Sequence, residues 1–217
     1  MFLACRAGRA TGIKGEIMTT LVERARLFAG KAHAGINQRR KYTDDPYIVH
    51  PRAVAEIVSR VPHSEAMLAA AWLHDTVEDT PTTLKDIERE FGPEVATLVG
   101  MLTNASQPED GDRIRRKNID RRHTAQASPQ AKTIKLADLI DNLHEILACD
   151  AEFAKTYLIE KRLQLEVLKE GNKTLWKRAR KIIDQALDSL HQPPYNVPAQ
   201  WFRDTERAYL NADRPHS

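Results

Sequence analysis

Four residues between positions 74 and 79 have side chains that commonly bind metal ions or transfer protons. They are His74, Asp75, Glu78 and Asp79, and they follow a run of consecutive apolar residues from Ala66 to Leu73. A helix that is apolar on every side is typical of the centre of a domain. Carboxylates and an imidazole at the end of such a helix are costly to desolvate. They therefore indicate a metal ion, a partner charge or a reacting substrate.

The spacing of these residues fits one site. His74 and Glu78 are four residues apart, as are Asp75 and Asp79, and residues four apart lie on one face of a helix. If the helix continues to Thr80, the two pairs form adjacent rows. For any one of the four residues, a frayed helix end with solvated acids is the plain alternative. The combination of all four after an apolar run favours a single site.

Two segments upstream are expected to bring further polar side chains to the domain. A helix from about Thr20 to Ala34 has its apolar residues on one stripe and should pack in the core. The polar loop from Gly35 to Tyr47 contains the basic run Arg39 to Lys41. A new helix is predicted to begin at Pro51, with His50 just before it. A histidine in that position is weak evidence of a ligand by itself.

Downstream, the segment from Arg113 to Arg122 is the most basic part of the chain. A solvated helix face and a phosphate-contacting surface both fit this composition. A long helix is predicted from about Pro129 to Cys149, with leucine and isoleucine side chains on one stripe. The same periodicity places Asp138 and Asn142 on the opposite side, where we expect them to be exposed.

The remaining pattern is helical as well. Two further helices are predicted at about Ala151 to Leu168 and Asn172 to His191. We therefore predict an all-α bundle that forms one domain over residues 18–191. We expect a disordered extension before it, residues 1–17, and a loosely packed, proline-containing tail after it, residues 192–217.

Composition narrows the class of protein. The 217 residues suit one domain. The chain has 33 basic and 30 acidic residues, and the resulting net charge of +3 requires neither a nucleic-acid nor a membrane partner. No apolar run approaches the roughly 18 to 20 residues needed to span a bilayer. The two cysteines, Cys5 and Cys149, match no zinc spacing, which fits a reducing compartment. We expect a cytoplasmic protein with a small-molecule partner.

Four short motifs carry a resemblance to a known family. They are PYIVHP (46–51), AAAWLHDTVEDT (69–80), TLKDIEREFG (83–92) and KLADLIDN (135–142). Together they resemble the hydrolase domain of the RelA/SpoT homologues. With neither a synthetase nor a regulatory domain following, the chain is similar to the stand-alone small alarmone hydrolases of the metazoan SpoT type. The resemblance spans residues 20–185 and implies the helical bundle of the HD-domain phosphohydrolases.

The resemblance also implies a metal centre. His50, His74, Asp75 and Asp138 match the family's four ligands to one divalent metal ion. Two imidazoles and two carboxylates suit a hard-to-borderline ion such as manganese, and this ligand set also accepts iron, cobalt or zinc.

Further roles follow from the same resemblance. Glu78 and Asp79 match the catalytic pair, which would orient or deprotonate a water molecule whose acidity the ion raises. Five residues match or lie near positions that contact the nucleotide substrate: Arg40, Lys41, Asn142, Arg113 and Tyr157.

The implied reaction is hydrolysis of the 3′-diphosphate of guanosine tetra- or pentaphosphate to GDP or GTP and pyrophosphate. The chain departs from the family pattern in the loop from Arg39 to His50, which has no glycine, and at Leu139 and Asp141. Asp141 is expected to add negative charge beside a phosphate. Adenosine alarmones, or a 2′- or 3′-phosphate such as that of NADPH, therefore stay open as substrates. So do a non-catalytic alarmone-binding module and a nucleic-acid-binding bundle that uses Arg113 to Arg122.

Overall fold

The computed structural model describes residues 19–213, and within them the chain forms α-helices, one short 3₁₀ turn and no β-strand. The predicted all-α class is confirmed, whereas the predicted extension at residues 1–17 lies outside the described part. None of the described helices is long and apolar enough to cross a membrane. In chain order the elements are α1 Leu21–Gly35, α2 Val49–Val58, α3 Glu65–Leu73, α4 Thr76–Asp79, α5 Leu84–Phe91, α6 Pro93–Leu102, the 3₁₀ turn Pro108–Asp110, α7 Arg113–Ala125, α8 Pro129–Cys149, α9 Ala151–Val167, α10 Lys173–His191 and α11 Ala199–Ala212.

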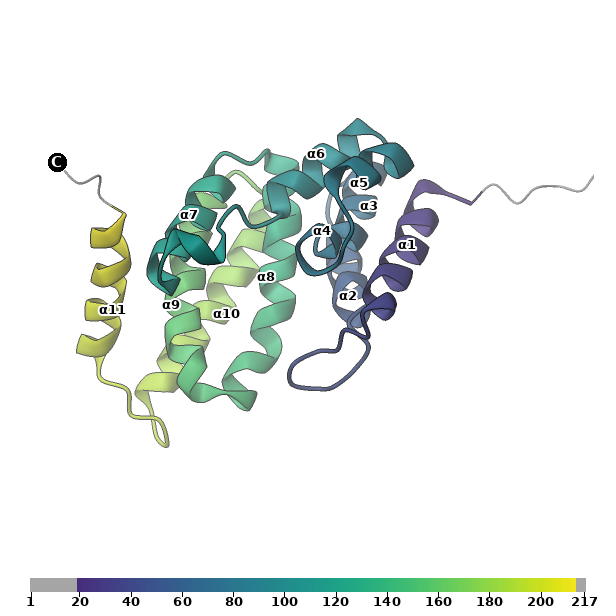
Figure 1. Cartoon of the computed structure of the whole chain (residues 1–217). Helices are drawn as coiled ribbons and strands as arrows, with labels where there is room; N and C mark the ends of the chain where they lie inside the picture. The colour runs from purple at the N-terminus through teal and green to yellow at the C-terminus, as the bar shows by residue number, and fades with distance from the viewer. Residues whose placement is uncertain (1–18, 214–217) are drawn as a thin grey trace, which may run out of the picture.

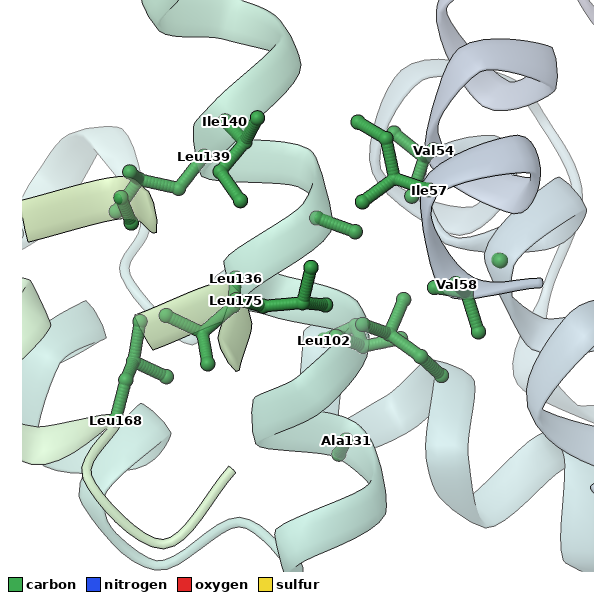
Figure 2. Packing of buried hydrophobic residues seen from close by; sticks show 14 of the residues in the cluster. Val54, Ile57, Val58, Leu102, Ala131, Leu136, Leu139, Ile140, Leu168 and Leu175 are labelled. Atoms are coloured by element: carbon green, nitrogen blue, oxygen red, sulfur yellow. The ribbon is translucent and has the colours of Figure 1, made fainter. Parts of the chain in front are cut away.

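Helix α8 lies at the centre of the bundle. It packs against α2, α3 and α6 on one side and against α9 and α10 on the other (Figure 1). Figure 2 shows Val54, Ile57 and Val58 pointing from α2 toward α8, where Leu136 is fully buried. A Cβ at Gly171 would lie 2.9 Å from the Leu136 side chain. Glycine therefore lets the turn between α9 and α10 approach α8 closely.

The central position of α8 explains a wrong prediction. The apolar stripe of this helix predicts an exposed Asp138, but Asp138 is only 6% exposed, and Asn142 is partly buried. Periodicity assumes that the side opposite the apolar stripe faces water. Because other helices cover α8 on several sides, its polar side faces an internal pocket instead.

Helix starts follow the capping residues in the sequence. The side chain of Thr20 accepts a hydrogen bond from the backbone of Glu23, and Ser128 accepts one from Ala131, each at 3.2 Å. Helix α2 differs from the prediction because it begins at Val49. His50 therefore lies in the first turn of α2 and not in front of it.

The segment from Ala66 to Thr80 does not form one continuous helix, so the condition for two adjacent rows of side chains is not met. Helix α3 ends at Leu73, His74 and Asp75 form a turn, and α4 follows. Two side chains contact carbonyl groups at this break: His74 Nδ1 lies 2.8 Å from the carbonyl oxygen of Ala71, and the Thr76 hydroxyl donates to that of Leu73 at 2.7 Å. Such local bonds replace helical backbone bonds and allow the chain to turn.

The C-terminal segment is not the loosely packed tail that the sequence predicts. Helix α11 packs against α7 and α9 and forms the outer edge of the molecule (Figure 1). Phe202 and Tyr209 are buried beneath it, and Asp213 pairs with Arg121 at 2.8 Å and with Arg122. The prolines before α11 delay the helix but do not prevent it from docking.

Candidate metal centre and substrate pocket

The four side chains predicted to bind a metal converge on one point. His50 comes from α2, His74 and Asp75 from the turn after α3, and Asp138 from α8. The Nε2 atom of His50 lies 3.2 Å from His74 Nε2, 3.5 Å from Asp75 Oδ2 and 3.3 Å from Asp138 Oδ1. His74 Nε2 lies 3.1 Å from Asp75 Oδ2 and 3.9 Å from Asp138 Oδ1. Residues far apart in the sequence therefore present four donor atoms to a common centre.

This donor set fits a divalent metal ion. His50, His74 and Asp75 alone form a group whose donor atoms all lie within 4.8 Å of one another, and Asp138 approaches the same two imidazoles. Both histidines are almost fully buried. Two imidazole nitrogens and two carboxylate oxygens suit borderline ions. Buried carboxylates around imidazoles also supply the negative charge that such an ion neutralises.

Groups behind the donor atoms orient both imidazoles. His50 Nδ1 lies 2.6 Å from Asp141 Oδ2, and His74 Nδ1 lies 2.8 Å from the carbonyl oxygen of Ala71. When each Nδ1 carries its proton, each Nε2 is left with a lone pair directed to the centre. Asp141, whose negative charge is expected beside a phosphate, is thus bonded to His50, and its carboxylate also lies 3.6 Å from the Arg40 guanidinium.

Asp138 has partners on both of its oxygens. Its Oδ1 accepts a hydrogen bond from the side-chain amide of Asn142 at 2.6 Å, and its Oδ2 pairs with Lys135 Nζ at 3.0 Å. The Arg40 guanidinium in turn donates to the Asn142 amide oxygen at 3.2 Å. The predicted substrate residue Asn142 thus contacts a predicted metal ligand directly, and Arg40 is linked to that ligand through Asn142.

Charges at the centre shift its pKa values in opposite directions. Burial opposes protonation of His50, but hydrogen bonds to the carboxylates of Asp138 and Asp141 outweigh it and raise the pKa to about 9. Burial likewise opposes ionisation of Asp138, yet the ammonium of Lys135 and the two imidazoles hold the pKa of this carboxyl well below its usual range. The site therefore favours carboxylates and an added positive charge, and a metal ion would compete with protons for the imidazoles.

Glu78 and Asp79 are neighbours in sequence but have different surroundings. Glu78 lines the same pocket as Asp75 and Asp138, and its carboxylate accepts hydrogen bonds from the side chain and backbone of Asn104 at 2.6 and 3.2 Å. Asp79 accepts one from the Gln38 amide at 2.9 Å. Partial burial of each carboxylate raises the pKa of both groups, although the Glu78 residue as a whole is exposed. Only Glu78 of the predicted catalytic pair faces the pocket.

The pocket beside the metal ligands has a volume of about 170 Å³ and is strongly polar. A neighbouring groove of about 620 Å³ shares Glu78, Asn104, Lys117 and Asp120 with it, so the two adjoin. Of the predicted substrate residues, Asn142 lines the pocket and Arg113 lines the groove.

The other predicted substrate residues lie outside these two linings. Lys41 contacts the Tyr42 hydroxyl at 3.1 Å and pairs with Asp150 at 3.5 Å. Tyr157 packs against Phe153 at 5.5 Å between ring centroids. Arg40 reaches the site through Asn142, as described above.

The basic helix α7 is partly used to build the pocket wall. Both oxygens of the buried Glu160 accept hydrogen bonds from the Arg113 guanidinium, at 2.6 and 2.8 Å, and Tyr209 of α11 donates to the same carboxylate at 2.6 Å. Tyr209 and Glu160 also line the pocket. Sequence reasoning gave no role to either residue, because no motif marks them and α11 was not predicted.

Comparison with known proteins gives a consistent assignment. A family model described as HD domain matches residues 25–164. The MESH1 guanosine-3′,5′-bis(diphosphate) 3′-pyrophosphohydrolase of Xenopus tropicalis is 39% identical over 135 residues, which are 61% of this chain and 73% of that protein. The human MESH1 protein is 39% identical over 128 residues, 58% of this chain and 69% of that protein.

A larger enzyme and a solved structure extend the comparison. A GTP pyrophosphokinase of Streptomyces coelicolor is 39% identical over 123 residues, but these are only 14% of that protein. A structure described as a metazoan ortholog of SpoT that hydrolyzes ppGpp aligns with a TM-score of 0.69 and 31% identity, over 76% of this chain and 94% of the other. The expected resemblance to the RelA/SpoT homologues is confirmed. The chain belongs to the HD-domain family, within the group that contains the MESH1 guanosine-3′,5′-bis(diphosphate) 3′-pyrophosphohydrolases.

Proposed function

We propose that this protein hydrolyses the 3′-diphosphate of guanosine 3′,5′-bis(diphosphate) and of the corresponding pentaphosphate, releasing pyrophosphate and GDP or GTP. The observation that carries the proposal is the convergence of His50, His74, Asp75 and Asp138 beside a pocket lined by Glu78. It occurs in a chain similar to MESH1 pyrophosphohydrolases over more than half its length.

The four converging side chains would hold one divalent ion, for which we propose manganese. Such an ion supplies Lewis acidity: it raises the acidity of water and offsets negative charge on a phosphate oxygen. The protein's own contribution is to keep both imidazoles oriented through Asp141 and the Ala71 carbonyl. Because these partners are preformed, the ligands need little rearrangement.

Glu78 is proposed to take the proton from the attacking water. Its pKa is raised by burial, which brings the carboxylate closer to the range of an effective general base. The water oxygen joins the phosphorus attached to the ribose 3′ oxygen, and the bond between that phosphorus and the 3′ oxygen breaks. The 3′ oxygen leaves with the proton that Glu78 accepted, and pyrophosphate is released. Asp79, held by Gln38, is proposed to position Glu78 and the water through its charge.

The nucleotide is proposed to lie between the loop before α2 and helices α7 and α9. The guanidinium of Arg40, next to Asn142, can stack on a base, and Lys41 can pair with a phosphate. Tyr157 is proposed to lie beside the ribose and Arg113 to face the phosphates along the groove. We also propose the cytoplasm as the compartment and residues 18–191 as the catalytic domain.

One experiment tests the reaction and its substrate. Manganese-loaded protein is incubated with guanosine tetraphosphate, its adenosine analogue and NADPH, and the products are resolved by anion exchange. We expect GDP and pyrophosphate from the guanosine nucleotide as the fastest reaction. If the adenosine nucleotide or NADPH is turned over faster, that nucleotide and not the guanosine nucleotide is the preferred substrate. Tight binding of the guanosine nucleotide without any product would identify a binding module instead.

A further inference from the structure

Lys161 on α9 is a pocket cation that the proposed reaction does not use. Its side chain lines the same pocket as the metal ligands Asp75 and Asp138. Two other lysines, Lys117 of α7 and Lys135 of α8, line this pocket as well. Three ammonium groups from three helices therefore surround one polar space beside the metal centre.

The three lysines differ in how their charge is balanced. Lys117 pairs with Asp120 at 3.5 Å, and Lys135 pairs with Asp138 at 3.0 Å. Within residues 19–213, no carboxylate forms an ion pair with Lys161; its ammonium group donates to the Gln164 amide oxygen at 3.1 Å. It also lies 4.9 Å from the centroid of the Tyr157 ring. These direct partners are neutral, and the carboxylates of Asp138 and Glu160 act on the ammonium group only from a distance.

An ammonium group without a directly paired carboxylate is unfavourable in this position when no ligand is bound. Burial, and then the proximity of Lys135 and Lys117, lowers the pKa of Lys161 to about 8, because these effects outweigh the opposing charges of Asp138 and Glu160. An anion among the three lysines would reverse this penalty, because each of them would gain an opposite charge. The pocket therefore suits a ligand with more negative charge than the metal centre alone can neutralise.

The contacts also order the lysines along the pocket. Lys135 touches the metal ligand Asp138 directly, so it lies next to the reacting phosphate. Lys161 makes no such contact among the described residues, and its polar partner Gln164 lines the pocket beside it. A group bonded to the reacting phosphate would therefore lie in the pocket that Lys161 lines.

We propose that Lys161 binds the second phosphate of the substrate's 3′-diphosphate, and that it thereby selects diphosphates over single phosphates at the reacting position. This inference rests on the proposed hydrolase function and adds a determinant of substrate class to it. A substrate with one phosphate at that position would leave the charge of Lys161 unbalanced.

The test compares two guanosine nucleotides that differ by one phosphate. Manganese-loaded wild type, Lys161→Met and Lys161→Arg are assayed with guanosine 3′,5′-bis(diphosphate) and with guanosine 5′-diphosphate 3′-monophosphate. Lys169→Met removes the same charge from the exposed surface just beyond α9 and serves as the matched control. Pyrophosphate binding to each protein is measured in parallel by titration calorimetry, which does not depend on turnover.

We expect Lys161→Met to lower kcat/KM for the bis(diphosphate) roughly 10- to 100-fold and to change that for the monophosphate less than about threefold. In Lys161→Met the Kd for pyrophosphate should rise by a factor similar to the loss of kcat/KM for the bis(diphosphate). Lys161→Arg should recover most of both losses, and Lys169→Met should match wild type. Equal losses on both nucleotides, or unchanged pyrophosphate binding in Lys161→Met, would overturn the role of Lys161. If the wild type hydrolyses neither nucleotide, the proposed function fails, and the calorimetry still decides whether Lys161 binds a diphosphate.

Discussion

The inner and outer ends of the pocket are built from different interactions. At the inner end, side chains from α2, from the turn after α3 and from α8 meet through short bonds between buried or partly buried groups, such as His50 with Asp141 at 2.6 Å. At the outer end, α7, α9 and α11 meet through ion pairs that each include a partly exposed side chain, such as Arg113 with the buried Glu160 and Asp213 with Arg121. Buried, mutually bonded groups fix positions closely, whereas exposed pairs contribute less and respond to salt.

The part of the outer end that α11 supplies lies outside the segment that the HD-domain model matches. All four proposed metal ligands and Glu78 lie within residues 25–164, the part that the HD-domain model matches. Tyr209 and Asp213, which complete the outer wall, lie beyond it. The difference suggests that the shared part carries the chemistry and that the C-terminal helix adjusts substrate binding. Substitutions at the inner end should therefore act on metal and turnover, and those at the outer end on KM.

The largest effect is expected for Asp138→Ala. This change removes one of the four donor groups and leaves the buried ammonium of Lys135 and the amide of Asn142 without their partner. Bound metal should be lost, and pyrophosphate release should fall on the order of 10³-fold or more. Metal content by mass spectrometry and a pyrophosphate assay measure the two effects. The control Asp184→Ala, on the exposed face of α10, should retain bound metal and pyrophosphate release. Full activity in Asp138→Ala would show that Asp138 is not part of the metal centre.

Glu78→Gln should separate turnover from metal binding. The amide keeps the size of the side chain but cannot accept a proton, so kcat should fall roughly 10²- to 10⁴-fold with metal content unchanged. Glu88→Gln, on the exposed side of α5, is the matched control. A parallel loss of metal would make Glu78 a ligand and not the proposed base.

The pH dependence of the wild type sharpens this assignment. Glu78 must be ionised to accept a proton, and burial raises its pKa above the ordinary value of a glutamate. As pH falls through that raised pKa, the carboxylate becomes protonated and kcat/KM should decline. The decline should begin above about pH 4.3, the usual glutamate pKa, and should be absent from the residual activity of Glu78→Gln. An identical acid limb in both proteins would assign it to another group.

The inner end was more accessible to sequence reasoning than the outer end. Apolar periodicity placed α8 correctly, because the apolar stripe is a local signal. The convergence of His50 with Asp138 could only be inferred through family resemblance, since spacing within one helix does not encode contacts between helices. The burial of Asp138 was missed for the same reason. Helix α11 was missed because only Phe202 and Tyr209 are buried in it and prolines precede it, so the apolar pattern is weak.

A smaller effect is expected for Asp141→Asn. The substitution weakens the bond that orients His50 and removes the negative charge facing its Nδ1. Metal affinity should fall roughly 10- to 100-fold, while activity at saturating metal stays close to wild type. A manganese titration followed by activity and by calorimetry measures the shift, and Asp141→Glu should restore part of it. If affinity is unchanged while KM rises, Asp141 acts on the nucleotide, as its proximity to Arg40 also permits.

The smallest effect is expected at the outer wall, for Tyr209→Phe. Only the hydroxyl is lost, and Glu160 keeps both bonds to Arg113. Losing one hydrogen bond to a buried carboxylate costs about 1 to 2 kcal/mol, which would loosen Arg113 and raise KM roughly five- to tenfold at nearly constant kcat. Tyr195→Phe, at an exposed position before α11, should leave both constants unchanged. A fall in kcat with constant KM would show that α11 acts on the inner end, and the division between the two ends would then fail.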